Sequence, residues 1–437
     1  MAQIANMARI PELRKRIFFA LGLLAVYRLG VQVPTPGIDA VALKQFFDQQ
    51  ANTILGVLNL FSGGALERFS IFALGIMPYI SASIIFQLLT VVFPYLEKLN
   101  KEGEQGRKKI QQYSRYLTIV LAVVQGFGIA TFLQSQSAGG NSLVLEPGLW
   151  FKIQTVITLT SGTAFLMWLG EQITERGIGN GISLIIFAGI VAGFPRAMGN
   201  TFELVRANQM SPLFLLVLVA FMLVVTYFIV FFEQAQRRIP VQYAKRVVGR
   251  KMMQGQSTYL PLKINMAGVI PPIFASSLLT FPATVASFSQ AAWVQKMSDS
   301  LSYGGWIFNT IQVVMIVFFC YFYTAVQFNP DDVADNMKKY GGYVPGIRPG
   351  KNTSHYIEKV LERLTLAGGV YLAVICTVPV LLQTKGGVSF YFGGTSLLIV
   401  VGVALDTMAQ IESHLMNHHY DGFLSAKSSR KLKARKG

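Results

Sequence analysis

The stretch Ser211–Phe232 reads SPLFLLVLVAFMLVVTYFIVFF and contains no charged side chain. A helix that crosses a hydrocarbon core of about 30 Å needs about 20 mostly apolar residues, so this stretch predicts a transmembrane helix. The whole chain agrees with that prediction. Hydrophobic residues make up 52% of its 437 positions and charged residues 14%, with a mean hydropathy of +0.46, which differs from the balance of a soluble domain.

Apolar runs of similar length recur along the rest of the chain, and together they predict an all-α polytopic membrane protein with ten transmembrane helices. The expected spans are 17–33, 74–94, 115–134, 150–170, 182–198, 211–232, 266–289, 306–328, 365–383 and 393–411. Basic residues precede the first run as in a signal peptide, but no small-residue cleavage site follows it. We therefore expect the first run to be a retained span.

An even number of spans places both termini on one side, and the Lys and Arg residues indicate which side. Short loops on the cytoplasmic side retain positive charge, and with both termini in the cytoplasm that side holds 30 of the 38 Lys and Arg residues. A nucleic-acid-binding protein with the same net charge of +17 would carry its basic residues on a soluble face. Here they lie between apolar spans.

Ten spans divide evenly into two five-helix halves, which would be inverted relative to each other because five is odd. The expected divisions are an N-terminal half at 1–198, a hinge at 199–210, a C-terminal half at 211–411 and a basic cytoplasmic tail at 412–437. Residues 59–74 are too short to span and are interrupted by Glu67 and Arg68. Irregular backbone at membrane depth is tolerated only inside protein or beside a water-filled cavity, so this segment indicates a pore.

The sequence lacks the motifs of several enzyme classes. Gly103–Arg107 has neither the spacing nor the lysine–hydroxyl pair of a phosphate-binding loop, so we expect no ATP hydrolysis. All four histidines lie outside the expected spans, which argues against a zinc helix or an intramembrane serine–histidine pair. Cys320 and Cys376 fall in apolar stretches and are expected to be packing residues. We expect no catalysis, no cofactor and no metal site.

Two charged residues and one glycine-rich turn stand out within this apolar sequence. Arg28 and Asp406 lie late in the first and tenth spans, so they approach opposite membrane faces and are interpreted as snorkelling side chains. Gly177–Gly181 contains three glycines in five residues and fits a tight turn that opens onto the fifth span. An ordinary helix connector would explain the same glycines.

Two long motifs carry a specific resemblance to a known family. FALGIMPYISAS at Phe72–Ser83 and QITERGIGNG at Gln172–Gly181 closely resemble the SecY protein-translocation channel family. Further matches are YAKR at Tyr243–Arg246, NMAGVIP at Asn265–Pro271, VPGIRPG at Val344–Gly350 and GGTSLLIVV at Gly393–Val401. The resemblance therefore covers nearly the whole chain.

The resemblance implies two pseudo-symmetric inverted five-helix halves around a central hourglass pore, with a short plug helix at about 60–73. It also implies a waist of apolar side chains. By motif position these are Ile76, Ile80, Ile182, Ile186, Ile273 and Ile399. Isoleucine is stiff at χ1 and its i, i+4 pairs share a helix face, so such a ring would exclude water and ions. Without the resemblance, each would be an ordinary packing residue.

Two further groups of residues acquire a role only through the resemblance. Gln87, Gln125 and Asn265 match a polar group at the family's lateral gate, where mutual hydrogen bonding is expected because unpaired amides are costly in hydrocarbon. Simple interhelical bonding is the alternative. The long basic loops 237–264 and 334–357 match the family's docking sites for SecA and the ribosome, with Arg246 and Arg348 as key arginines. A solvated, topology-setting loop is the alternative there.

The implied function is a passive, gated channel that lets unfolded secretory proteins cross the bacterial plasma membrane and releases transmembrane segments sideways into the lipid bilayer. Its implied partners are the small membrane subunits SecE and SecG, the SecA ATPase or a translating ribosome, signal sequences and nascent chains. The span count also allows a secondary transporter for a small solute, but a paired midplane charge is missing. An intramembrane enzyme would need a nucleophile and a base at matching depth, which we do not find.

Overall fold

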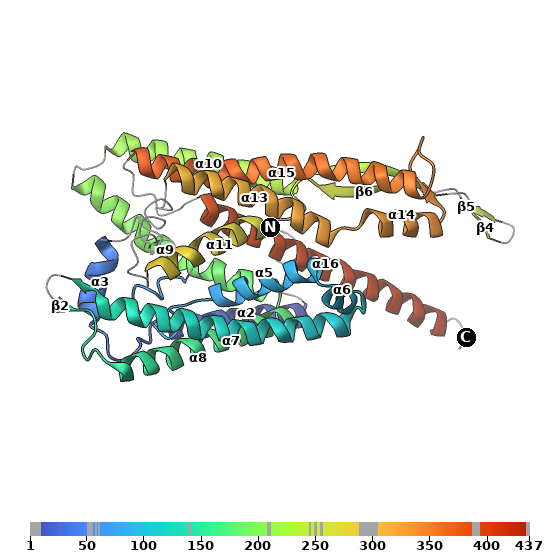
Figure 1. Cartoon of the computed structure of the whole chain (residues 1–437). Coiled ribbons are helices and arrows are strands. Elements are labelled where there is room, and N and C mark those ends of the chain that lie inside the picture. Colours follow the sequence, from blue (N-terminus) through green and yellow to red (C-terminus); the bar gives the residue numbers. More distant parts are fainter. Residues whose placement is uncertain are drawn as a thin grey trace. The chain divides into compact units, whose positions relative to one another are not determined.

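The computed structural model describes residues 10–49, 56, 59, 62–138, 141–207, 211–243, 246–248, 251–253, 257–287, 305–386 and 394–433. The chain forms two compact units, and helices dominate both (Figure 1). The first unit consists of Met1–Thr201, Thr280–Asp299 and Val403–Gly437, and the second of Phe202–Leu279 and Ser300–Gly402. The predicted mainly helical membrane fold is confirmed.

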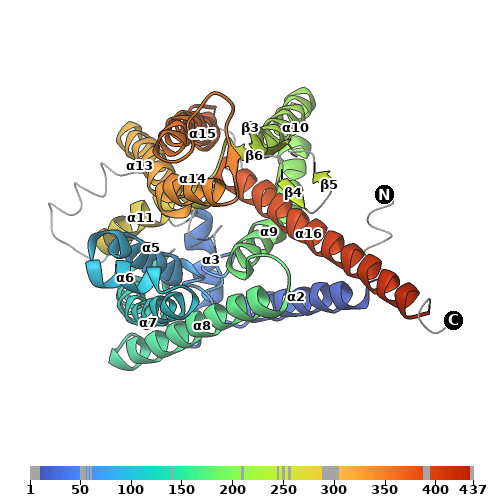
Figure 2. The same ribbon diagram turned by 90° about the vertical axis from the view of Figure 1, so that its right-hand side faces the viewer.

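The first unit is built on long helices that follow the apolar runs of the sequence. Its elements are α2 (Pro11–Gly30), α3 (Ala40–Gln49), α5 (Met77–Val92), α6 (Pro94–Lys101), α7 (Glu104–Ser135), β1 (Ser137–Ala138), β2 (Asn141–Ser142), α8 (Leu149–Arg176) and most of α9 (Gly181–Arg206). Helices α7 and α8 lie side by side in both ribbon views (Figures 1 and 2). A proline in the first turn of α2, α5 and α6 fits the helix start, where its missing N–H is not needed.

The second unit combines long helices with a small sheet. Its elements are α10 (Pro212–Gln234), β3 (Gln236–Tyr243), β4 (Arg246–Val248), β5 (Lys251–Met253), β6 (Ser257–Lys263), the start of α11 (Ile270–Ser287), α13 (Trp306–Gln327), α14 (Pro330–Lys339), β7 (Gly342–Tyr343), α15 (Lys351–Gly386) and the start of α16 (Gly394–Lys433). Helices α13 and α15 pack against each other. The free cysteines Cys320 and Cys376 are buried on them, as expected of packing residues.

Strands β3, β6 and β7 connect the two basic loops through one sheet. The sequence did not predict this pairing. Strand β3 lies between β6 and β7 in an antiparallel sheet, with Ile239 opposite Leu260 and Gln242 opposite Tyr343. One face of the sheet packs on α14 and α15. That core contains Ile239, Val241, Leu262, Met337, Val344, Ile357 and Leu361. Loops 237–264 and 334–357 therefore form one folded surface of the second unit.

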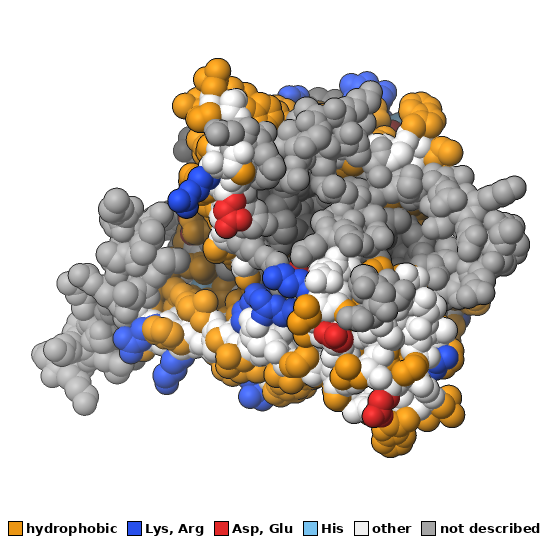
Figure 3. Space-filling model, turned by 90° about the vertical axis from the view of Figure 1, so that its left-hand side faces the viewer, with side chains coloured by type: hydrophobic (Ala, Val, Ile, Leu, Met, Phe, Trp, Pro, Cys, Tyr) orange, Lys and Arg blue, Asp and Glu red, His pale blue; other side chains and the backbone are white. Residues whose placement is uncertain are grey.

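Each of the ten expected spans overlaps a helix. Among the described residues, seven helices are long and apolar enough to cross a membrane, and the pair α5 and α6, bent by 99°, makes an eighth candidate. Almost none of the apolar window of α10 is buried inside the protein, and such a surface fits lipid. Figure 3 views the left-hand end of the molecule in Figure 1, where Lys and Arg side chains lie among hydrophobic ones. The count of ten spans stays a prediction.

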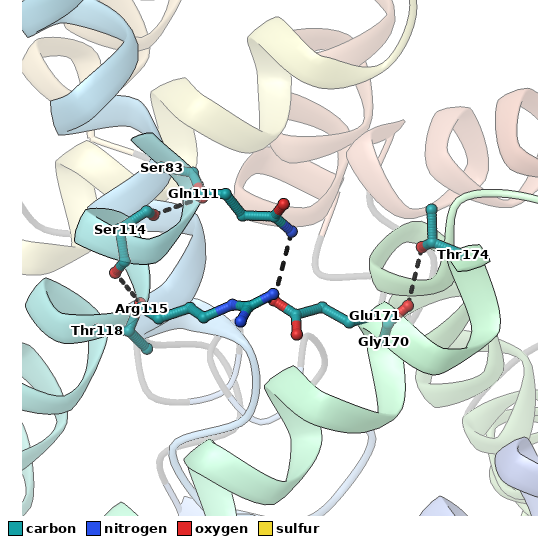
Figure 4. Close-up of polar contacts among 8 residues, drawn as sticks. All are labelled: Ser83, Gln111, Ser114, Arg115, Thr118, Gly170, Glu171 and Thr174. Carbon is teal, nitrogen blue, oxygen red and sulfur yellow. Dashed lines mark hydrogen bonds and ion pairs between the residues drawn. The ribbon is translucent and has the colours of Figure 1, made fainter. Parts of the chain in front are cut away.

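A polar network fixes α5 against α7 and α8 (Figure 4). The hydroxyl groups of Ser83 on α5 and Ser114 on α7 lie 3.3 Å apart. On the next helix, the carboxylate of Glu171 accepts from Nε of Arg115 at 2.7 Å and from Nε2 of Gln111 at 3.4 Å. The Glu171 side chain is only 11% exposed, so water competes little for this carboxylate. The network therefore holds the three helices in one arrangement.

We expect Glu171→Ala to lower the free energy of unfolding by about 1 kcal/mol, since it removes a charge-assisted hydrogen bond to a partly exposed arginine. Equilibrium unfolding in mixed detergent micelles measures the change. Glu104→Ala is the matched control, because its ion pair with Lys108 joins two exposed side chains and should contribute much less. Equal effects of the two substitutions would contradict the assigned role of the network.

Candidate functional site

Residues 62–76, called the turn segment below, precede α5 and form consecutive turns. The short helix predicted at about 60–73 is therefore not found in its described part. Side-chain bonds replace helical ones: the Glu67 N–H donates to Oδ1 of Asn59 at 2.9 Å, Nδ2 of Asn59 donates to the Glu67 carboxylate at 3.3 Å, and the Leu66 N–H donates to the Ser62 hydroxyl. These local bonds compete with helix formation and tie the start of the segment together and to Asn59.

The turn segment is packed into the first unit along its length. The N–H of Thr35 donates to the carbonyl of Phe69 at 2.8 Å, and the N–H of Ile71 donates to the carbonyl of Val33 at 3.1 Å. Phe69 is buried and has a positive φ of 43°, a conformation that is unfavourable for a bulky residue. A side chain at Gly162 on α8 would overlap the Ile71 carbonyl. The contacts with both neighbours thus hold a strained backbone in place.

The segment folds back on the start of α5, where the first two predicted pore residues lie. Gly75 has a φ of 57°, and a Cβ atom built on it would contact Cα of Ser62 at 3.5 Å. Ile76 immediately precedes α5, and Ile80 follows one turn later; both are buried. The beginning of the turn segment therefore lies beside the end that carries Ile76.

The glycine-rich turn between α8 and α9 positions Ile182 and Ile186. A side chain at Gly181 would overlap the carbonyl of Gly170 on α8, so the two helices approach closely here. Oδ1 of Asn180 accepts from the N–H of Ile182 at 3.1 Å and caps α9. Ile182 is half-buried and Ile186 is buried. The tight-turn interpretation of these glycines is confirmed.

The remaining two pore residues belong to the second unit. Ile273 lies in the first turn of α11 and Ile399 in the second turn of α16, and both are buried. A side chain at Gly402 would overlap Val269, so α16 and the residues before α11 are in close contact. Four of the six isoleucines thus lie in the first unit and two in the second. The ring itself stays a prediction.

The predicted gate residues have different surroundings. Gln87 on α5 and Gln125 on α7 are half-buried, and within the described structure Oε1 of Gln87 has no hydrogen-bond partner. Asn265 is buried, and its Nδ2 donates to the Glu233 carboxylate at 2.7 Å and to the Gly268 carbonyl at 3.0 Å. Sequence reasoning missed Glu233, although an acidic residue that directly follows an apolar span was a visible signal.

The two predicted docking arginines lie on the joined basic loops. Arg246 begins β4 and is paired in register with Met253. Arg348 is exposed in the turn before α15, where its carbonyl accepts from the Thr353 hydroxyl at 3.0 Å. That bond fixes the backbone beside Arg348 while its side chain stays accessible. Their role in docking stays a prediction.

The snorkelling interpretation of Arg28 is wrong. Nη1 of Arg28 donates to the carbonyl of Gly63 at 3.0 Å, and the hydroxyl of the preceding Tyr27 donates to the carbonyl of Ser62 at 3.1 Å. The sequence could not indicate these bonds, because the acceptors are backbone atoms 35 residues away. Asp406 is exposed on α16.

Comparison with known proteins identifies the same family that the sequence motifs resemble. The SecY family model matches residues 70–408. Two similar relatives are both named protein translocase subunit SecY. The one from Vibrio cholerae serotype O1 is 55% identical over 422 residues, covering 95% of this chain and 94% of its own. The one from Escherichia coli strain K12 is 54% identical over 419 residues, with the same coverage.

Solved structures show the same fold at lower identity. One described as the structure of a protein conducting channel has a TM-score of 0.68 at 17% identity, and covers 94% of this chain and 96% of that one. Sec61 in the canine ribosome-channel complex from the endoplasmic reticulum has a TM-score of 0.65 at the same identity and coverage. Given the matched family model and these relatives, the chain belongs to the SecY family.

Proposed function

We propose that this chain is the channel-forming subunit of a bacterial protein translocase, which conducts unfolded secretory proteins across the membrane. The relatives named protein translocase subunit SecY support this function. One structural observation carries it: a non-helical segment lies packed against the helices α2, α8 and α9, with Ser62 against Gly75 beside Ile76. Such backbone is tolerated inside a membrane where protein or a water-filled cavity surrounds it. The alternative of a small-solute transporter has no support among these relatives.

In this proposal, Ile76, Ile80, Ile182, Ile186, Ile273 and Ile399 form the narrowest part of the channel. Ile80 on α5 follows four positions after Ile76, which immediately precedes that helix, and Ile186 follows four positions after Ile182 at the start of α9, so the members of each pair point to the same side. Branched apolar side chains would seal around a passing chain, because they exclude water and offer it no fixed hydrogen bonds. No covalent chemistry is needed in this step.

The turn segment would act as the plug that closes the resting channel. A bound signal sequence shifts the equilibrium toward the open channel if it binds that state more tightly than the closed one. Gln87, Gln125 and Asn265 would line the lateral exit to lipid.

The basic loops 237–264 and 334–357, which carry Arg246 and Arg348, would dock the partners that deliver the polypeptide. Arginine side chains bind phosphate and carboxylate groups in a bidentate manner, so Arg246 and Arg348 could serve a ribosome or the SecA ATPase. Two structural neighbours, canine Sec61 and yeast Ssh1, were solved in complexes with ribosomes. SecE and SecG would complete the membrane complex. The proposed location is the bacterial plasma membrane, with these loops and both termini in the cytoplasm.

A photoreactive residue at Ile80 or Ile273 tests the pore. With a secretory chain arrested midway through translocation, we expect crosslinks from both positions, because both would touch the moving polypeptide. Leu216 on α10 is the matched control, since its side chain is 66% exposed on an apolar helix and should contact lipid instead. Crosslinks from Leu216 alone, or from none of the three, would refute the pore assignment.

Arg348→Ala tests the docking surface. We expect the affinity for SecA or for ribosomes to fall about tenfold, the equivalent of about 1.4 kcal/mol, because a charge-assisted hydrogen bond is lost. Binding to proteoliposomes measures it. Lys351→Ala is the control, as Lys351 is a nearby exposed cation that lacks the planar arginine fork. An unchanged affinity in Arg348→Ala, or an equal loss in both variants, would count against a specific arginine contact.

A further inference from the structure

Arg28 on α2 forms a hydrogen bond to the turn segment, although charged residues are rare within membrane-spanning helices. Arg28 lies in the last turn of α2, the helix of the first expected span, and ionisable groups inside membrane proteins are costly and tend to be functional. Its guanidinium is half-buried, and Nη1 donates to the Gly63 carbonyl at 3.0 Å. A snorkelling arginine would reach for the headgroups, whereas this one reaches into the protein.

The preceding residue makes a matching bond. Tyr27 is 2% exposed, and its hydroxyl donates to the Ser62 carbonyl at 3.1 Å. Its ring packs against Phe72 of the same segment at a centroid distance of 6.1 Å. Two consecutive residues of α2 therefore hold two consecutive carbonyl groups of the turn segment.

A close backbone contact with α9 lies directly beside these two bonds. A Cβ atom on Gly63, which has a φ of 67°, would lie 2.7 Å from Cα of Gly189 on α9. A Cβ on Gly189 would in turn lie 3.2 Å from the Tyr27 hydroxyl oxygen. Gly63 thus lies where α2 and α9 meet, and that position has no space for a side chain.

We infer that Arg28 and Tyr27 are positioning residues that latch the turn segment in the closed channel. The inference rests on the proposed plug role of the segment. The bonds of Asn59 to Glu67 and of Leu66 to Ser62 keep the start of the segment together, so it can move as one body once the two carbonyls are released. The later part stays tied to residues 33–35 through Phe69 and Ile71. The two latch bonds go to backbone carbonyl groups of Ser62 and Gly63 and not to side chains of the segment.

Accessibility of the segment tests the latch in the full-length protein in proteoliposomes. Ala65 is 0% exposed, and Ala65→Cys reports its release through reaction with a water-soluble maleimide, in a background with Cys320→Ala and Cys376→Ala. We expect Arg28→Ala to raise the modification rate about tenfold, and Tyr27→Phe to raise it about threefold, as expected for losing a charged and a neutral hydrogen bond. Arg28→Lys should lie between parent and Arg28→Ala.

Arg68→Ala is the matched control, because Arg68 is an exposed arginine of the same segment and its loss should leave the rate unchanged. Tyr27→Phe removes a single hydroxyl and guards against misfolding of the arginine variants. Unchanged rates in folded Tyr27→Phe and Arg28→Lys would overturn the latch, as would an equal increase in Arg68→Ala.

An export assay distinguishes a failure of the latch from a failure of the proposed plug role. Release of a plug should allow export of a precursor with a damaged signal sequence in Arg28→Ala but not in Arg68→Ala. Faster maleimide reaction together with this export supports both statements. Faster maleimide reaction without export of that precursor would support the latch and argue against a plug role for the segment.

Discussion

Backbone N–H and C=O groups at membrane depth must find partners within the protein, because lipid offers none. The turn segment meets this constraint without forming a helix. Its N–H and C=O groups bond to one another, to the extended residues 33–35, and to the side chains of Tyr27 and Arg28. Arg28, a charged residue in the first expected span, is thereby explained: the Gly63 carbonyl of the turn segment needs a hydrogen-bond donor, and Arg28 supplies it.

The same constraint accounts for the small residues around the segment. Gly30 on α2, Gly162 on α8 and Gly189 on α9 each face it where a side chain would collide with Phe72, Ile71 or Gly63. The ring of Phe72 lies against Gly30 and Gly162 and stacks on Phe165 at a centroid distance of 6.0 Å. Close packing leaves few alternative positions for the segment, so a closed and an open state can be distinct.

Hydrophobic length predicted the helices well, because it is a local property: the stretch Ser211–Phe232 became α10 with nearly the same ends. The proposed pore isoleucines could be singled out only through family resemblance, since nothing local distinguishes them from other packing residues. Long-range pairings were missed. Strand β3 pairs Gln242 with Tyr343, about a hundred residues away, and Arg28 bonds to a carbonyl that has no sequence signature.

The account as a whole depends on passage of a polypeptide through this chain. The most direct measurement reconstitutes it with SecE and SecG in liposomes, adds SecA, ATP and a secretory precursor, and assays protection of the precursor from external protease. The account predicts protected full-length precursor that requires both ATP and this chain. Equal protection in liposomes that lack the chain, or none with it present, would contradict the account.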